Sequence, residues 1–390
     1  MSYWKLRDRL KMKTFLKHIV LFLRLGSFFR KSRESFFCIF DILGGTIFKL
    51  FGLTELKEFN EKTVKNILII RMDRIGDVIL STPAIRAVRE TFPNAQIHLL
   101  VMPYTKDLVI NNPNINKLLV YKKDVLDKDY DLAFVLCPGI LPNYMAFKSG
   151  AKVRIGYSVK GGSFFLTSKL NDDRAARVKH TVESALEVVG IIECKTSNKK
   201  LEISITPQGE NFANNFFKQN NLMHNDLVIV VHPGARQKHI RWKKERFAKI
   251  ADILINEKTA KIILIGSENE RSLIEEVTAL MSGKAILALG LRLTELISLI
   301  KRVNLFIGNS TGPMHIAAAL QIPTVAIFGN IHPLDSYQKW GPWGNGHMIV
   351  SKNLQCNNCH PSDCYDFMCL ESITVDDVLG VVKKQLKNLL

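Results

Sequence analysis

The chain has 390 residues, of which 47% are hydrophobic and 23% are charged, and this composition excludes a disordered protein. A single hydrophobic core rarely extends over a chain of this length, so we expect two domains. The formal net charge of +18 indicates an anionic partner: a membrane surface, a nucleic acid or a phosphorylated substrate. Because the sequence shows neither aromatic residues interleaved with basic ones nor a helix-turn-helix pattern, we do not expect nucleic-acid binding.

Positive charge is concentrated at the start of the chain, where residues 1–33 hold ten Lys or Arg and one Asp. The apolar residues of 10–25 recur at helical spacing, with most of the basic residues off that stripe, which indicates an amphipathic helix. Basic flanks beside a Phe-rich apolar face are typical of helices that lie in the membrane interface. We therefore predict that residues 1–60 form an extension that binds an anionic membrane surface. Packing of a helix against the rest of the protein is the alternative.

A second apolar stretch, 36–53, reads FFCIFDILGGTIFKLFGL. Asp41, Lys49 and a Gly-Gly pair interrupt it, so it lacks the ~20 uninterrupted apolar residues that a membrane-spanning helix needs. Neither stretch ends in a small-residue cleavage site, so we expect no cleavable signal. The expected location is cytoplasmic, at the inner face of the cytoplasmic membrane. A short helical hairpin that dips into the bilayer is a weaker alternative.

From residue 66 onward, short apolar runs alternate with helical patterns in two series, and the first helix is expected over 77–91. The runs have the length and composition of buried parallel strands, and they are 67–70, 97–101, 117–121, 131–136, 227–232, 261–265, 285–289, 304–308 and 324–328. Such alternation is typical of doubly wound sheets. We predict an α/β protein with two Rossmann-like domains, 66–205 and 225–350, that face each other across a cleft. A helix and linker are expected within 206–226.

Open parallel sheets bind ligands beyond the carboxyl ends of their strands, so the loops after the predicted strands form the candidate site. The first such loop reads RMDRIGD, where Gly76 allows a close turn and Asp77 stands at the start of the next helix. A carboxylate at that place can take a proton from an approaching hydroxyl. The alternative role for Asp77 is that of a helix N-cap.

Three loops of the second series carry polar residues suited to a nucleotide. Arg241 follows the motif HPGA and could pair with phosphate oxygens, although a solvated basic loop would have the same composition. Glu270, just beyond a strand, could accept hydrogen bonds from ribose hydroxyls or belong to the acidic first turn of a helix. The last loop is the most specific. There, Thr311, Gly312 and the amides of the next helix suit a diphosphate, and His315 could add a hydrogen bond or positive charge.

Residues 351–390 combine a cysteine-rich loop with a C-terminal helix. The cysteines follow the pattern C-x2-C-x4-C-x4-C and are Cys356, Cys359, Cys364 and Cys369. Four thiols this close in sequence can hold a structural zinc ion, or less favourably an iron–sulfur cluster. Free thiols are the alternative, and disulfides are disfavoured in a cytosolic protein. The loop lies away from the phosphate motifs, so we expect no catalytic role for it.

These loops, in this order, resemble those of glycosyltransferase family 9, the ADP-heptose:lipopolysaccharide heptosyltransferases. The resemblance runs from about Asn66 to the C-terminus, and it is carried by ILIIRMDRIGDVILSTPAIRAVRETFPNAQIHLLV, HPGA with its following Arg-Trp, and FIGNSTGPMHIAAALQIPTVAIFG. A weaker match is the stretch Arg154-Ile155-Gly156-Tyr157. The resemblance implies the GT-B architecture and an inverting transfer that needs no metal cofactor.

The resemblance also implies roles for individual residues. Asp77 matches the proposed general base of the family, and Arg241 matches a basic residue that contacts the donor phosphates. Glu270 matches an acidic residue at the nucleoside end of the donor. The diphosphate loop of the family is matched by Thr311, Gly312 and His315. The implied partners are an ADP-heptose donor and a lipid-linked or lipopolysaccharide-core acceptor.

Two positions depart from the family pattern. Many members carry Asp where this chain has Ser310, and if that Asp recognises the donor sugar, the sugar here need not be heptose. Members also often carry Pro where this chain has Lys243. A family member that uses another nucleotide sugar is therefore the runner-up. A membrane-bound sugar-nucleotide-binding protein that has lost catalysis is the alternative from a different functional class.

Overall fold

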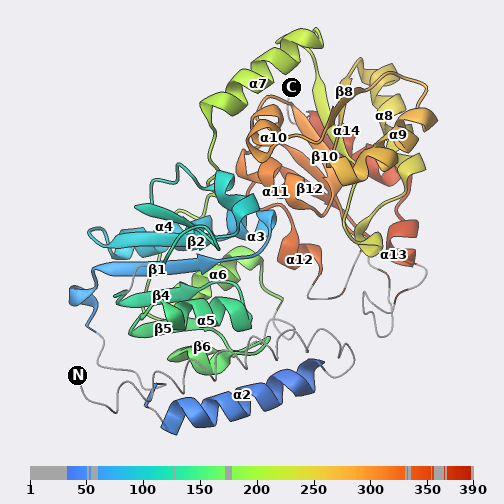
Figure 1. The fold of residues 1–390 in the computed structure, drawn as a ribbon. Coiled ribbons are helices and arrows are strands. Elements are labelled where there is room, and N and C mark those ends of the chain that lie inside the picture. The colour runs from blue at the N-terminus through green and yellow to red at the C-terminus, as the bar shows by residue number, and fades with distance from the viewer. Residues whose placement is uncertain are drawn as a thin grey trace.

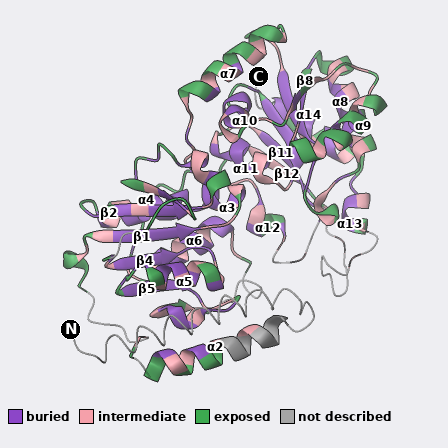
Figure 2. Ribbon diagram, in the orientation of Figure 1, coloured by how far each residue is buried: buried purple, intermediate pink, exposed green. Residues whose placement is uncertain are grey.

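The computed structural model shows two α/β domains, with helix α2 (Arg33–Leu50) lying along the outer side of the first (Figure 1). The described residues are 33–50, 52–53, 60–126, 129–171, 178–329, 332, 335–352, 354, 364 and 367–387. The helix predicted within 10–25 lies outside these residues, and so do Cys356 and Cys359. In both domains the central strands are buried, while most helices have both buried and exposed positions (Figure 2).

The first domain is built on a six-stranded parallel sheet in the order β3-β2-β1-β4-β5-β6. Its strands are β1 (Asn66–Arg71), β2 (Gln96–Val101), β3 (Lys117–Val120), β4 (Leu132–Val135), β5 (Val153–Tyr157) and β6 (Ser168–Leu170). The helices that cover it are α3 (Ile75–Leu80), α4 (Thr82–Thr91), α5 (Ile140–Lys148) and α6 (Thr181–Gly190). Strand β1 is buried from Ile67 to Arg71 because helices cover both faces of the sheet.

The second domain repeats this topology with the order β12-β11-β10-β7-β8-β9, again all parallel. Its strands are β7 (Val228–His232), β8 (Lys261–Gly266), β9 (Ile286–Leu289), β10 (Leu305–Asn309), β11 (Thr324–Ile327) and β12 (His347–Val350). Its helices are α8 (Lys244–Lys258), α9 (Arg271–Leu280), α10 (Leu293–Ile300), α11 (Gly312–Ala319), α12 (Tyr337–Trp340), α13 (Met368–Glu371) and α14 (Val375–Lys387). The predicted α/β class with two doubly wound sheets is confirmed.

The structure differs from the sequence prediction in two respects. The single helix expected over 77–91 is two helices, α3 and α4, which meet at Ser81. Pro83 stands in the first turn of α4 and has no backbone N–H to donate to the preceding turn, so a new helix begins there. Strands β5, β6 and β12 were not predicted. Arg154 and Gly156 interrupt the apolar run of β5, β6 carries the polar pair Ser168 and Lys169, and β12 is a short strand at the sheet edge.

Two helices, one before the first strand of the second domain and one after its last strand, pack on that domain. The predicted linker helix is α7 (Pro207–Gln219), and it packs closely on α10. Gly209 allows this approach because it has no side chain: an added Cβ would lie 2.4 Å from the carbonyl oxygen of Thr294. The C-terminal helix α14 contributes Val378 and Val382 to the core formed around β7 and β10. Helix α14 therefore packs on the second domain.

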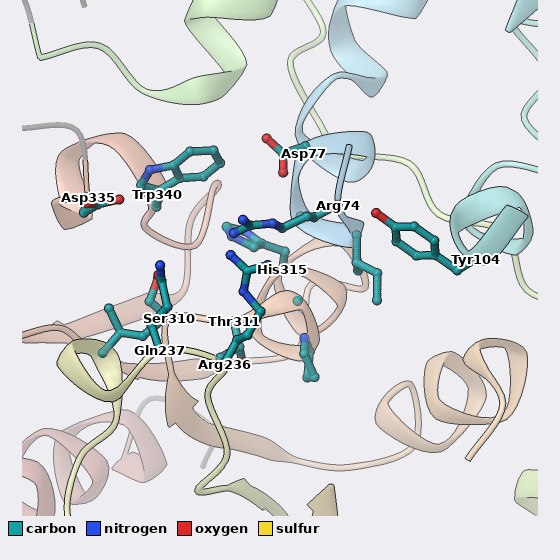
Figure 3. Close-up of a pocket in the computed structure, with 15 residues that line it drawn as sticks. Arg74, Asp77, Tyr104, Arg236, Gln237, Ser310, Thr311, His315, Asp335 and Trp340 are labelled. Carbon is teal, nitrogen blue, oxygen red and sulfur yellow. The ribbon is translucent and has the colours of Figure 1, made fainter. Parts of the chain in front are cut away.

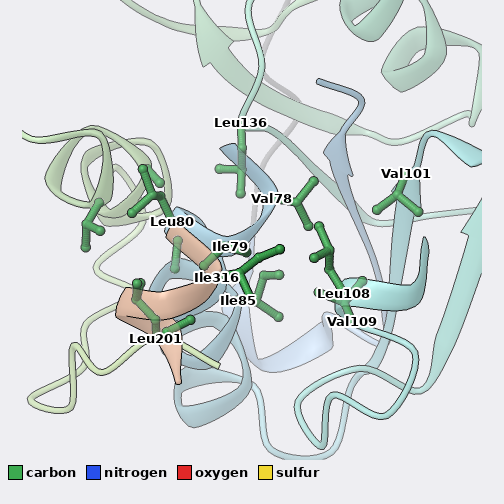
Figure 4. Close-up of a cluster of buried hydrophobic side chains, with 14 of the residues drawn as sticks. Val78, Ile79, Leu80, Ile85, Val101, Leu108, Val109, Leu136, Leu201 and Ile316 are labelled. Atoms are coloured by element: carbon green, nitrogen blue, oxygen red, sulfur yellow. The ribbon is translucent and has the colours of Figure 1, made fainter. Parts of the chain in front are cut away.

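The hydrophobic core is continuous between the domains. Ile316 of α11 is fully buried in the same cluster as Val78 and Leu80 of α3 (Figure 4). Leu201, which leads into the inter-domain linker, joins this cluster. The carboxyl-terminal edges of the two sheets are thereby held against each other at α3 and α11.

Helix α2 is docked on the first domain through the residues that interrupt its apolar sequence. The Asp41 carboxylate accepts hydrogen bonds from the backbone N–H groups of Gly162 (2.6 Å) and Ser163 (3.2 Å). A Cβ on Gly44 would lie 2.3 Å from the Phe164 ring, so only glycine allows this approach. Phe48 is fully buried in an aromatic cluster with Phe164. None of the helices in the described parts of the chain has the length and hydropathy to span a bilayer.

Candidate active site

The candidate site lies where the strand order of each sheet reverses, between β1 and β4 in the first domain and between β7 and β10 in the second. Ligands of doubly wound sheets bind at such switch points, beyond the carboxyl ends of the strands. A central cavity of about 460 Å³ is lined there by residues of both domains. Figure 3 shows Arg74 and Asp77 of the first domain facing Thr311, His315 and Arg236 of the second.

Glycines bring the two domains into contact at this cavity. A Cβ on Gly76 would lie 2.5 Å from Cδ2 of His315, and a Cβ on Gly312 would lie 3.2 Å from Cβ of Ile75. The first turn of α3 therefore packs against the first turn of α11 with no side chain between their backbones at these points. This places the N-terminus of α11 beside the loop that carries Asp77.

Asp77 lies in the first turn of α3, but Arg74 is the N-cap of that helix and makes no side-chain capping bond. The Asp77 carboxylate is 16% exposed, and its Oδ1 lies 3.4 Å from a terminal nitrogen of Arg71. The Arg71 guanidinium is only 4% exposed. Its Nε donates to the backbone carbonyl of Asp77 at 3.0 Å, and another nitrogen donates to the Leu136 carbonyl. Arg71 therefore fixes both the backbone and the carboxylate of Asp77. Because Arg74, and not Asp77, is the N-cap of α3, the N-cap alternative for Asp77 does not hold.

Asp73 is a second carboxylate beside Asp77 that the sequence analysis missed. Its Oδ1 lies 3.2 Å from Nε of Arg71, but it accepts no hydrogen bond. Burial raises the pKa of Asp73 to about 7, against the attraction of Arg71, and the negative charge of Asp77 adds to the rise. Two carboxylates that share one buried guanidinium could have been suspected from RMDRIGD, in which both stand within six residues of Arg71.

A nucleotide-sized cavity of about 420 Å³ extends from the central cavity into the second domain. Its inner wall is an apolar slot formed by Ile265, Ala288, Leu291, Leu293 and Leu296, and Glu270 and Ser267 stand at its edge. Such a slot is suited to a planar base, and the carboxylate beside it to the hydroxyls of a ribose.

Glu270 is linked to the Thr311 loop through His232. Nδ1 of His232 lies 3.1 Å from Oγ1 of Thr311, and its Nε2 lies 3.6 Å from a carboxylate oxygen of Glu270. Burial alone would raise the pKa of Glu270, but interactions with His232 and Ser267 outweigh it and lower the pKa to about 2. Glu270 is therefore ionised throughout the physiological range, and it acts as an acceptor only.

The loops after β7 and β10 are tied together by Asn309. Its Nδ2 donates to the carbonyls of Pro233 (2.9 Å) and Gly234 (3.2 Å), and its Oδ1 accepts from the Trp242 backbone at 3.0 Å. Asn309 is fully buried, so these bonds are shielded from water. The HPGA turn and the Thr311 loop thus form one rigid cradle.

Arg241 lines neither of these cavities, and the direct phosphate contact predicted for it stays a prediction. Its guanidinium donates to the carbonyl of Ala235 and so anchors the loop from within. The cations that line both cavities are Arg74 and Arg236, which sequence reasoning missed. The short helical turn Lys238–Ile240 separates Arg236 from Arg241 and sends them in different directions.

His315 lines the central cavity, where it is 4% exposed. Burial, with a smaller contribution from His180, lowers the pKa of His315 to about 3. Without a bound anion the ring is therefore neutral near pH 7, which favours the predicted hydrogen bond over a positive charge.

An inner cavity of about 340 Å³ opens on the first-domain side of Asp77. It shares Asp77, Asp335 and Trp340 with the central cavity. Two lysines also line it, Lys160 and Lys339. A second substrate placed there would reach Asp77 from the side opposite the nucleotide cavity.

The predicted zinc site stays a prediction. Cys364 and Cys369 are described, but their two partners lie outside the described residues, so the fit of four ligands is untested. Among the residues that the structure does describe, no group of three or more His, Cys, Asp or Glu is arranged to hold a metal ion.

Comparisons with known proteins agree with this geometry. A model of glycosyltransferase family 9 (heptosyltransferase) matches residues 119–366. The lipopolysaccharide core heptosyltransferase OpsX of Haemophilus influenzae is 23% identical over 356 residues, with 82% of this chain and 96% of that protein covered.

Solved structures share the fold. A family 9 glycosyl transferase from Veillonella parvula superposes with a TM-score of 0.75 at 23% identity, covering 86% of this chain and 100% of that one. The ADP-heptose lipopolysaccharide heptosyltransferase II of Escherichia coli superposes with a TM-score of 0.67 at 20% identity, covering 83% and 99%. The GT-B architecture is thereby confirmed. Since the family match spans well over half of the chain, this protein is a glycosyltransferase that belongs to glycosyltransferase family 9 (heptosyltransferase).

Proposed function

We propose that this chain transfers a heptose from ADP-heptose to a lipopolysaccharide-core-type acceptor, with inversion at the anomeric carbon and without a catalytic metal. The observation that carries the proposal is that Asp77 and Arg74 of the first domain and Arg236 and Thr311 of the second line one central cavity. A base and an anion site on either side of one space are what sugar transfer from a nucleotide diphosphate requires.

In this proposal the donor lies on the second domain. The base enters the apolar slot, Glu270 accepts hydrogen bonds from the ribose, and the diphosphate rests on Thr311 and the amides at the start of α11. Arg74 and Arg236 bind the phosphate oxygens from the two sides of the cavity. These charges stabilise the departing ADP, which is the role that a metal ion has in other transferases.

The acceptor enters through the inner cavity. Asp77 takes the proton of the acceptor hydroxyl while its oxygen attacks the anomeric carbon, and the bond from that carbon to the diphosphate breaks on the opposite side. Lys160 and Lys339 line this cavity beside the carboxylates of Asp73, Asp77 and Asp335, and they could pair with a negatively charged group of the acceptor. We place the reaction at the inner face of the cytoplasmic membrane, where residues 1–60 bind anionic lipid and the acceptor is lipid-linked.

Ser310 supports a second candidate, transfer of a different sugar. It lines the central cavity at the position where many family members carry Asp, and Asp335 from another loop lines the same cavity. If Asp335 recognises the sugar hydroxyls in place of residue 310, the donor would be an ADP- or GDP-linked sugar other than heptose.

The test is Asp77→Asn in the full chain. Loss of the base is expected to lower the rate of ADP release from ADP-heptose with a lipopolysaccharide-core acceptor by about 10²- to 10⁴-fold, with the ADP affinity unchanged. The matched control is Glu90→Gln, an exposed acid on α4 of the same domain, which should turn over normally. Normal turnover of Asp77→Asn would refute the assignment. Wild-type protein that binds ADP but transfers no sugar would favour the non-catalytic alternative.

A further inference from the structure

Helix α2 has an inner face that contacts the first domain and an outer face that does not. Its inner face holds Asp41, Gly44 and Phe48, which fix it to the first domain. The Leu53 carbonyl, just beyond the helix, accepts a hydrogen bond from the buried Arg154 at 2.8 Å. The helix is therefore held at its middle and near its end, and its orientation relative to the first domain is set.

The outer face of α2 is apolar and has no partner among the described residues. Ile42 and Leu43 are each 61% exposed, and Leu50 is 79% exposed. Thr46 and Lys49 are also exposed and lie on the same side, because the spacing 42, 43, 46, 49 and 50 follows the helical repeat. Large aliphatic side chains on one stripe of a surface helix mark an interaction surface.

The charge around this face favours an anionic lipid bilayer as its partner. Over residues 41–50, Lys49 is the single charged residue on the outer face of α2, and Asp41 is turned inward onto backbone amides. The 32 residues that precede α2 join it at its first residue, Arg33, and residues 1–33 hold ten basic residues and one acidic residue. A second copy of the chain would bring this same excess of positive charge against itself, which opposes self-association.

We propose that the outer face of α2, formed by Ile42, Leu43, Thr46, Lys49 and Leu50, is a docking surface that inserts into the interface of an anionic bilayer, with the helix parallel to the membrane. This deepens the membrane association proposed above by assigning it to one rigid face. Because α2 is fixed to the domain that carries Asp77, docking also fixes the orientation of the inner cavity relative to the membrane.

The test compares two full-length double variants. Ile42→Glu/Leu43→Glu puts two charges on the outer face. Val125→Glu/Met223→Glu makes the same charge change at two other exposed apolar residues, which are 84% and 66% exposed. Binding is measured by co-sedimentation with vesicles of phosphatidylcholine and phosphatidylglycerol and with vesicles of phosphatidylcholine alone. Leu50→Glu serves as an independent single variant on the same face.

The expected result is that the α2 double variant binds the anionic vesicles on the order of tenfold or more weakly than wild type, because two aliphatic side chains no longer leave water. The vesicle affinity of the control should stay within about twofold of wild type. ADP should raise the melting temperature of wild type and of all variants equally. A failed donor assignment would show separately, as the absence of this rise in every protein. An equal loss in both double variants would mean that charge alone binds the membrane and would overturn the proposal. A wild-type dimer that Ile42→Glu/Leu43→Glu converts to a monomer, with vesicle binding unchanged, would also overturn it.

Discussion

Replacing Gly234 by alanine would disturb the proposed nucleoside end of the site while leaving the fold almost intact. An added Cβ would lie 2.1 Å from Oε1 of Glu270 and 2.8 Å from Nε2 of His232. The nearest atom is the end of a flexible side chain at the cavity edge, so we expect the fold to be kept, at the cost of the hydrogen bonds that Glu270 gives up when it moves. Glu270 cannot move without giving up its bonds to the Ser267 backbone (2.9 Å) and hydroxyl (2.8 Å).

The magnitude follows from the bonds that Glu270 would make to a ribose. A hydrogen bond to a charged group contributes about 1.5–3 kcal/mol. At about 1.4 kcal/mol for each factor of ten, displacing the carboxylate should raise the Kd for ADP by about 10- to 100-fold. The loss in free energy of unfolding without ligand should be smaller than the loss in ADP binding energy. At the cavity edge, Ser267 and the displaced Glu270 can form hydrogen bonds with water instead of with each other.

Titration calorimetry with ADP measures the effect directly. The matched control is Gly380→Ala in α14, where an added Cβ meets nothing within 4 Å. That variant should bind ADP like wild type and gain up to about 1 kcal/mol of stability from better helix propensity. A Kd for Gly234→Ala within twofold of wild type would show that Glu270 does not contact the nucleoside.

Two further substitutions test the catalytic side of the cavity. The pKa of Asp73 is raised from 3.8 to about 7, so between these values the folded chain holds a proton that the unfolded chain has lost, and the contribution of this group to stability falls as pH rises through the window. Asp73→Asn should remove that fall, so its melting temperature relative to wild type should increase from pH 5 to pH 8; a constant difference would contradict the raised pKa. Gly76→Ala would place a Cβ 2.5 Å from the buried His315 ring, and we expect about 1–3 kcal/mol of destabilisation in denaturant melts together with a lower kcat. Equal stability and kcat would contradict the close contact of α3 with α11.

The central strands of both domains were predictable because burial on two faces demands continuous apolar sequence, as in β1 and β7. Short edge strands carry no such requirement, and β6 was missed for that reason. The role of Asp41 was also hidden. It looked like an interruption of an apolar run, but it is the residue that bonds α2 to the first domain, since its partners lie more than 100 residues away in sequence.

The candidate site was predictable where function depends on position after a strand, as for Asp77 and Thr311. It was not predictable where one turn of backbone decides which side chain reaches the cavity. Arg236 and Arg241 stand five residues apart in one loop, and only the conformation of the loop directs the first to the cavity and the second to the Ala235 carbonyl. The motif RMDRIGD could suggest Asp73, but its raised pKa follows only from the burial that it shares with Arg71 and Asp77.

The contact between α3 and α11 has a consequence for how substrates enter and leave. A second contact joins the domains where Thr181 donates to the Lys339 carbonyl (3.1 Å) and His180 lies 3.0 Å from the Gly341 carbonyl. If the domains rotate about a line through these two contacts, Asp77, next to one of them, would keep its distance from the start of α11 while the nucleotide cavity widens. The contact of α10 with the turn Pro103–Leu108, at the nucleotide cavity, would have to part in such a rotation. Donor exchange would then be mechanically separate from the alignment of the reacting atoms.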